Sequence, residues 1–140
     1  MSKHKSRVLY LSLVLLLTAF IWGNSLQSAT VSDEASGWVL ALIQSIIDTL
    51  SLGVIHLTNH IVRKAAHLTE FTLQGACLAA TLRAYGKNIR TALLLGCATA
   101  IIDEGIQSFT PGRSCQLSDV LLDTVGSGVG MLLVSWWNRR

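Results

Sequence analysis

Apolar residues along the 140-residue chain are gathered in four long blocks that are separated by polar connections. The blocks predict helices over approximately residues 8–23, 61–83, 91–107 and 119–137. Each is close to the roughly 20 residues that a membrane-spanning helix needs, although the third is short enough to be an ordinary buried helix. We therefore predict an all-α fold in a single domain over residues 1–140, an integral membrane four-helix bundle.

The connection between the first two blocks contains an amphipathic pattern over approximately residues 33–50. Apolar side chains recur there at spacings of three and four, with polar residues between them. Ser32 is placed to cap this helix, Asp33 and Glu34 follow in its first turn, and Gly53 can end it. The pattern predicts an interfacial helix on the outer membrane surface, in the first outer loop. A helix packed over the outer mouth of the bundle is an equally good explanation.

Charge is scarce in this chain, and its distribution predicts the orientation. Charged residues make up 14% of the sequence and the mean hydropathy is +0.51, whereas soluble domains carry about 25% charged residues. Most basic residues fall on one side if both termini are cytoplasmic, as the positive-inside rule requires. These residues are Lys3, Lys5, Arg7, Arg83, Lys87, Arg90, Arg139 and Arg140. We predict a multi-pass membrane protein with the lipid bilayer as partner.

The N-terminal segment and the basic residues each allow one other interpretation. The basic start and first apolar block resemble a signal peptide cleaved after Ala29, but Gln27 stands where a small residue is wanted, so an uncleaved helix is preferred. Nucleic-acid binding is not expected, because the basic residues are dispersed over three segments without a folded domain.

Carboxylates on three predicted helices lie at a similar depth. Glu70, Asp103 and Asp123 are 13 to 16 residues from the basic residue that marks the cytoplasmic end of their helix, which corresponds to roughly 20–24 Å of helical rise. A charge at the bilayer centre costs about 2.5–3.5 kcal/mol on the insertion scale. These acids should therefore face one another across a wet cavity in the outer leaflet. An ion-pair network that only holds the bundle together is the structural alternative.

Helical spacing also places polar residues on common faces. Three sets share a face: Arg63, His67, Glu70 and Gln74; Asp103 and Glu104 with Gln107; and Asp119 and Asp123 with Gly126 and Gly130. The last set combines acids with a small-xxx-small surface for close helix packing. We expect these faces to turn inward together.

The residue types indicate acid–base chemistry on an amphiphilic substrate. Paired carboxylates allow one to act as acid while another acts as base or nucleophile. We predict Glu104 or Asp103 as base, His67 as acid or base, and Glu70 as the orienting partner of His67. The proposed reaction is hydrolysis or group transfer by a membrane-embedded enzyme. The other polar residues are candidates for substrate binding, namely Arg63, Lys64, Gln107, Arg113, Asp119 and Asp123.

No cofactor is identified and no residue is assigned as a metal ligand, although the acids and His67 include enough ligands for Zn²⁺ or a harder ion. His56 and His60 are interpreted as interfacial polar residues. Cys77 and Cys97 are expected to pack within helices, and Cys115 has no known base beside it to make it a nucleophile.

The combined pattern resembles the VanZ-like family of small bacterial membrane proteins. The matching elements are Arg63-Lys64-x-x-His67-x-x-Glu70-Phe71, Asp103-Glu104-x-x-Gln107, Pro111-Gly112-Arg113, Asp119-Val120 through Asp123 to Gly126, and Asn24-Ser25-Leu26. The family more often shows asparagine at Asp123. The resemblance implies a protein of the bacterial cytoplasmic membrane and cell envelope. It also implies a link to tolerance of teicoplanin, a lipoglycopeptide antibiotic.

Three functions are compatible with these features. The first is an enzyme acting on a lipid-linked or amphiphilic envelope substrate at the outer leaflet. The second is a non-catalytic protein that binds or shields a lipid or the antibiotic. The third is a proton-coupled transporter, which is disfavoured because the acids cluster at one face of the membrane.

Overall fold

The computed structural model describes residues 3–49 and 57–137, and within these residues the chain is entirely helical. Five helices follow one another: α1 (Lys3–Ser25), α2 (Ala29–Thr49), α3 (Asn59–Ala84), α4 (Thr91–Ser108) and α5 (Leu117–Trp137). The predicted all-α fold is confirmed, with helix boundaries that differ by a few residues. Predictions for residue 50, Gly53, His56, Arg139 and Arg140 fall outside the described residues.

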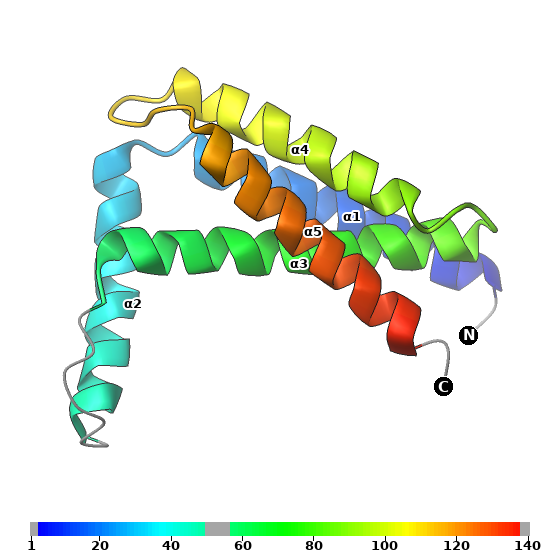
Figure 1. Ribbon diagram of the computed structural model, residues 1–140, viewed down its shortest axis with the longest axis horizontal. Helices are drawn as coiled ribbons and strands as arrows, with labels where there is room; N and C mark the ends of the chain where they lie inside the picture. Colours follow the sequence, from blue (N-terminus) through cyan, green and yellow to red (C-terminus); the bar gives the residue numbers. More distant parts are fainter. Residues whose placement is uncertain (1–2, 50–56, 138–140) are drawn as a thin grey trace.

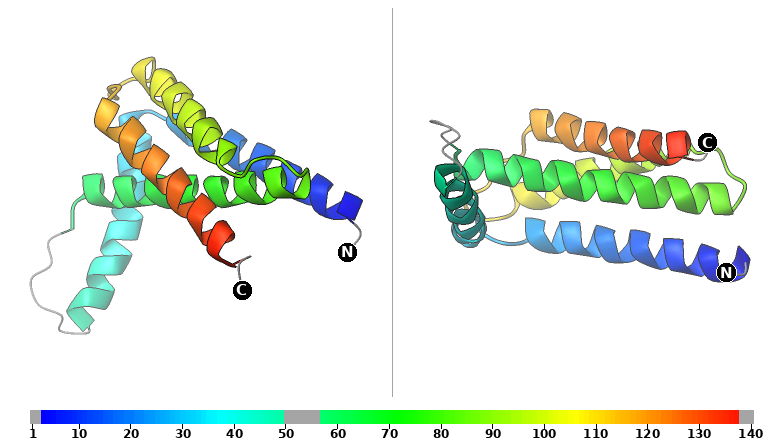
Figure 2. Two further views of the ribbon diagram at one scale, coloured as in Figure 1. Left: turned by 45° about the vertical axis from the view of Figure 1, so that its right-hand side comes forward. Right: turned by 90° about the horizontal axis from the view of Figure 1, so that it is seen from below.

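Four of the helices, α1, α3, α4 and α5, pack alongside one another, and α2 lies across the end where α3 begins (Figure 1). The two views in Figure 2 show α1 running beside α3, with α2 crossing the end of both. Helix α5 makes its most extensive contacts with α3. The arrangement leaves one end of the four helices covered by α2 and by the connection between α4 and α5.

Helix α2 begins earlier than predicted, because its first turn is fixed by a neighbouring loop. Ala29 N–H donates to the carbonyl of Pro111 at 3.1 Å, and Ser32 N–H donates to Ser28 within the first turn. The predicted cap at Ser32 is therefore wrong, since Ser32 already lies inside the helix. A threonine cap does occur at the start of α3, where Thr58 Oγ1 accepts from the backbone of Ile61.

Glycines allow α3 and α5 to approach closely. A Cβ atom added to Gly130 of α5 would overlap the backbone of Thr72 and Ala76 in α3, and one added to Gly75 would overlap the backbone of Ser127. Gly126 meets α3 at Leu68 O, 2.9 Å from where its Cβ would lie. The predicted small-residue surface of α5 is therefore confirmed as its contact with α3.

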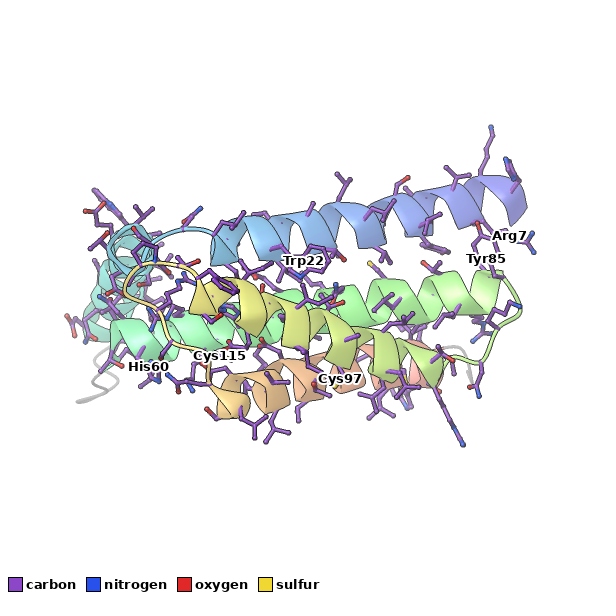
Figure 3. All side chains as sticks on the ribbon, turned by 90° about the horizontal axis from the view of Figure 1, so that it is seen from above. Arg7, Trp22, His60, Tyr85, Cys97 and Cys115 are labelled. Atoms are coloured by element: carbon purple, nitrogen blue, oxygen red, sulfur yellow. The ribbon has the colours of Figure 1, made fainter. Side chains whose placement is uncertain are left out.

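The opposite end of the molecule is basic and aromatic. Arg7 of α1 donates from Nε to the carbonyl of Ala84 at 2.8 Å and lies 5.1 Å from the ring centre of Tyr85. Figure 3 shows Arg7 and Tyr85 at one end of the molecule, and His60 and Cys115 at the other. The predicted polar site and the basic N-terminal segment are thus separated by the length of the helices.

Polar and apolar side chains are distributed in an unusual way. Apolar side chains point outward along the helices, for example Leu15 at 63%, Leu94 at 71% and Leu132 at 62% exposure. Fully buried side chains include the polar residues Ser25, Gln74, Asp103, Glu104, Asp123 and Ser127. Two described helices, His4–Ser25 and Leu117–Trp137, are long and apolar enough to cross a membrane by length and composition.

Candidate functional site

The polar residues predicted from the sequence meet at the end of the four packed helices that α2 covers. Helix α1 contributes its last turn, α3 its first half, α4 its last two turns and α5 its first two turns. The connection from Phe109 to Gln116 closes over them, and the 3.1 Å bond from Ala29 to Pro111 ties it to α2. Five segments of the chain therefore build one site.

Asp103 lies at the centre of this site and is 0% exposed. Ser25 Oγ donates to Asp103 Oδ1 at 2.6 Å, and Gln107 Nε2 donates to Oδ2 at 3.0 Å. Gln107 also approaches Ser25 Oγ at 3.4 Å. Both carboxylate oxygens are held by neutral donors, so the orientation of Asp103 is fixed, and among the described residues its one basic neighbour within 4 Å is His67.

His67 faces two carboxylates on other helices. Its Nδ1 atom lies 3.6 Å from Asp123 Oδ2 and 3.9 Å from Asp103 Oδ2. Asp123 is 0% exposed, and within the described residues neither of its carboxylate oxygens accepts a hydrogen bond. Burial without a donor is unusual for a carboxylate, because removing a polar group from water costs free energy unless it is hydrogen-bonded.

Glu104 is held by the backbone of the loop that follows α4. Its Oε2 atom accepts from Gln116 N–H at 2.8 Å, and the residue is 1% exposed. Its side chain lines a small polar cavity together with His67 and Asp123. One oxygen is therefore fixed by the backbone, while no donor to the other is found among the described residues.

Glu70 contacts a residue of α1 that was not among the predicted site residues. Asn24 Nδ2 donates to Glu70 Oε1 at 3.2 Å. The role of Glu70 as orienting partner of His67 stays a prediction, and the carboxylates within 4 Å of His67 in the described residues are Asp103 and Asp123. Asn24 and its neighbour Ser25 are functional candidates that the residue-by-residue search missed, although their dipeptide is part of the family resemblance.

The three outer cations differ in their partners. Lys64 Nζ binds Asp119 Oδ1 at 2.6 Å, and Arg63 Nη1 binds Asp33 Oδ1 of α2 at 3.0 Å. Arg113 is half-buried in the loop, and its Nε atom is buried without a hydrogen-bond partner among the described residues. Burial, followed by the neighbouring charge of Arg63, lowers the pKa of Arg113 from its ordinary value, but a guanidinium remains charged in proteins.

The predicted polar face of α3 is oriented toward α1 and α2. Gln74 is fully buried, and its Nε2 donates to Thr18 Oγ1 of α1 at 2.8 Å. One turn nearer the site, Glu70 meets Asn24, and at the start of the helix Arg63 meets α2. Glu70 and Gln74 therefore face α1 together, as their spacing predicts, whereas His67 of the same predicted set faces Asp103 of α4 and Asp123 of α5.

Two hollows meet at this site. A polar cavity of about 80 Å³ is lined by His60, Arg63, Lys64, His67, Glu104, Gln107, Arg113, Asp119, Leu122 and Asp123, with other residues of the loop. A larger groove of about 720 Å³ lies between α1, α2 and α3. Its walls are mostly apolar and include Phe20, Val39, Ile43, Leu57, Ile61 and Val62. Arg63, His67 and Arg113 line both hollows, so the groove and the cavity adjoin.

The remaining candidates make no hydrogen bond or ion pair with the buried acids among the described residues. Cys115 is exposed in the loop, while Cys77 and Cys97 are half-buried in α3 and α4. His60 lies on the wall of the polar cavity, at the end of the molecule opposite Arg7 (Figure 3). The structure thus groups His67 with the acids of α4 and α5, and it places the cysteines elsewhere.

Comparison with known proteins gives one match. No curated protein and no solved structure matches the chain. The sequence matches the family model described as VanZ/LLP1 over residues 8–138, which is nearly the whole length and includes every site residue discussed above. The chain therefore belongs to the VanZ/LLP1 family.

Proposed function

We propose that this protein is a multi-pass protein of the bacterial cytoplasmic membrane, in which α1, α3, α4 and α5 span the bilayer and both termini are cytoplasmic. The outward apolar side chains and inward polar side chains support this arrangement, because lipid is a good solvent for leucine and a poor one for carboxylates. The polar site then lies in the outer leaflet, and α2 lies at the outer interface, where its exposed Trp38 contacts the headgroup region.

The function that the geometry supports best is action on one amphiphilic molecule of the cell envelope. The observation that carries this proposal is the shared lining of the groove and the cavity by Arg63, His67 and Arg113. An apolar tail fits the groove, whose 720 Å³ lies within the range of about 300–1,000 Å³ typical of small-molecule sites. A polar head group then reaches the cavity, where the two arginines favour an anionic group such as phosphate.

The proposed reaction at that head group is hydrolysis or group transfer. Glu104 is the better base of the two acids considered, because Asp103 already accepts two side-chain hydrogen bonds while Glu104 accepts one backbone bond. Glu104 takes a proton from water or from an acceptor hydroxyl as that oxygen bonds to the electrophilic centre. The bond to the leaving group breaks, and the leaving oxygen takes up the proton that Glu104 accepted, which returns Glu104 to its carboxylate form. Arg113 stabilises the developing negative charge.

The alternative function is binding without chemistry. The same groove and cavity hold a lipid or the tail and head of a lipoglycopeptide, and protection against teicoplanin then follows from sequestration. The unpartnered Nε atom of Arg113 favours recognition of an anion in either case. The ligand occupies the same position in both proposed functions. Glu104 acts as a base in the enzyme and has no catalytic role in the binding protein.

Binding is tested with dodecyl phosphate, which combines a twelve-carbon tail with one anionic head group. Native mass spectrometry of the protein in dodecyl maltoside micelles counts the bound probe. We expect one molecule per chain and a loss of about tenfold in affinity in Arg113→Ala, because a charge-assisted hydrogen bond contributes about 1.5–3 kcal/mol. Ala66→Trp fills the groove and should weaken binding as much. Ala98→Trp, on the exposed face of α4, is the matched control. Equal binding by all four proteins contradicts the proposed site.

Chemistry is separated from binding by Glu104→Gln, which preserves size and removes the charge. Cells carrying the wild-type or the variant protein are challenged with teicoplanin, and the membrane level and unfolding midpoint of each protein are recorded. Lost protection at unchanged level and midpoint supports a catalytic Glu104. Retained protection, together with loss in Arg113→Ala, supports the binding function instead. Absence of protection by the wild-type protein contradicts the link to teicoplanin.

A further inference from the structure

Three ligand-type atoms from three helices converge behind the polar cavity. His67 of α3, Asp103 of α4 and Asp123 of α5 each offer one atom, and these atoms all lie within 4.8 Å of one another. His67 Nδ1 is 3.6 Å from Asp123 Oδ2 and 3.9 Å from Asp103 Oδ2. Ligand atoms around a tetrahedral Zn²⁺ are separated by ~3.3–3.4 Å, given metal–ligand distances of about 2.0–2.1 Å. The two distances from His67 exceed that spacing by about 0.2–0.6 Å, and the distance between the two carboxylates exceeds it by at most about 1.5 Å, so binding an ion requires the three side chains to move closer together.

Asp123 supplies a second and independent observation. Its carboxylate is fully buried, and among the described residues its one basic neighbour within 4 Å is His67, whose Nδ1 lies 3.6 Å from Oδ2, beyond hydrogen-bond distance. Oδ1 has no donor among the described residues, and a buried carboxylate oxygen without a donor is expected to have an unobserved partner. Because the lining of the polar cavity includes both Asp123 and His67, a small ion has a route to this position from the outer surface.

The surroundings of Asp103 resemble those of a metal-bound carboxylate. Ser25 and Gln107 hold both of its oxygens at 2.6 and 3.0 Å, and outer contacts of this kind orient metal ligands and are needed for full affinity. They supply no positive charge. Hydrogen bonds thus fix the direction of the carboxylate and leave its charge available to a cation.

The charges around the three residues favour a cation. Glu70 and Glu104 add two further acids at the same end of the helices, and Lys64 is already bound to Asp119. Arg113 lies on the wall of the cavity and makes no ion pair among the described residues. The acidic groups therefore outnumber the cations available to them.

We infer that His67, Asp103 and Asp123 form a binding site for one divalent transition-metal ion. One imidazole and two carboxylates are a donor set suited to Zn²⁺ or Mn²⁺, whereas Ca²⁺ prefers six to eight oxygen ligands. The remaining coordination positions face the polar cavity, where water or an anionic oxygen of a ligand can bind. The inference does not rest on the proposed function, because the ion is bound without any amphiphile.

The test uses the full-length protein, purified without a histidine tag and freed of metal with EDTA. Mn²⁺ is added to protein in dodecyl maltoside micelles, and electron paramagnetic resonance measures the free ion, whose signal is lost on binding. Zn²⁺ is examined by competition with bound Mn²⁺. We expect one site per chain, displacement of Mn²⁺ by Zn²⁺, and no displacement by an equal concentration of Ca²⁺.

Two variants and one control locate the site. Asp123→Asn keeps the shape of the side chain and should weaken Mn²⁺ binding by at least about 100-fold, since loss of an outer contact alone costs about 10–100-fold. His67→Gln should do the same, and it keeps the test decisive if Asp123→Asn fails to fold. Glu34→Gln removes one exposed carboxylate from α2 and should leave affinity unchanged. Absence of stoichiometric binding in the wild-type protein, or unchanged affinity in a folded ligand variant, overturns the inference.

Discussion

The contact between α3 and α5 makes the effect of one added methyl group predictable. Replacing Gly130 by alanine places a Cβ atom against the backbone of Thr72 and 2.6 Å from the backbone nitrogen of Ala76. Backbone atoms cannot turn aside as a flexible side chain can, so the two helices must separate. Overpacking of this kind costs about 1–3 kcal/mol, and the distances place Gly130→Ala at the upper end of that range.

Gly128→Ala is the matched control on the same helix. A Cβ atom there would meet only Leu93 Cδ1, at the ordinary contact distance of 3.4 Å. Both substitutions gain the same helix propensity, about 1 kcal/mol in favour of alanine, so that term cancels in the comparison. We therefore expect Gly130→Ala to be less stable than Gly128→Ala by about 2–3 kcal/mol.

Reversible unfolding by sodium dodecyl sulfate in mixed micelles, followed by circular dichroism, measures this difference. Equal free energies of unfolding for the two variants would refute the close contact between α3 and α5. The site should respond as well, because Asp123 lies seven residues before Gly130 on the same face of α5. Separation of the helices increases the distance from Asp123 to His67, so Mn²⁺ affinity should fall in Gly130→Ala and not in Gly128→Ala.

Three further predictions follow from single contacts. Ser25→Ala removes the 2.6 Å hydrogen bond to the buried Asp103, and we expect the free energy of unfolding in mixed micelles to fall by about 1.5–3 kcal/mol, as is typical of bonds to charged groups. Lys64 and Asp119 form a 2.6 Å ion pair, and their side chains are 32% and 25% exposed. A double-mutant cycle with Lys64→Met and Asp119→Asn should give a coupling energy of roughly 1 kcal/mol, and this energy should fall in high salt. Arg7→Lys removes the Nε donor to the last carbonyl of α3, and it should lower the free energy of unfolding by under about 1 kcal/mol without changing Mn²⁺ affinity.

Spacing along single helices was sufficient to predict much of the site. Glu70 and Gln74 share a face because they are separated by four residues, and both do contact α1. Likewise, the glycines of α5 indicated a close helix contact, which the structure places against α3. Which residues share a face of one helix can therefore be predicted from the sequence.

Contacts between helices were not predictable in the same way. Which carboxylate faces His67 depends on the rotation of α4 and α5 about their axes, and periodicity does not fix the rotation of one helix relative to another. Asn24 and Ser25 were not predicted as site residues from spacing, because they occupy the end of α1. A polar residue at a helix end is explained equally well by the end of the helix and by a functional role. The start of α2 was misplaced at Ser32, since the bond from Ala29 to Pro111 joins segments that are far apart in the chain.

The groove between α1, α2 and α3 has a consequence for how a ligand is supplied. Its walls carry exposed apolar side chains, and it adjoins the polar cavity at Arg63 and His67. In the membrane arrangement proposed above, an amphiphile that enters this groove sideways stays within the bilayer and does not expose its tail to water. Occupancy is then set by the mole fraction of the amphiphile among the surrounding lipids. Occupancy does not depend on the concentration of the amphiphile in the aqueous phase. The site is emptied by diluting the amphiphile with other lipids, and adding buffer has no effect.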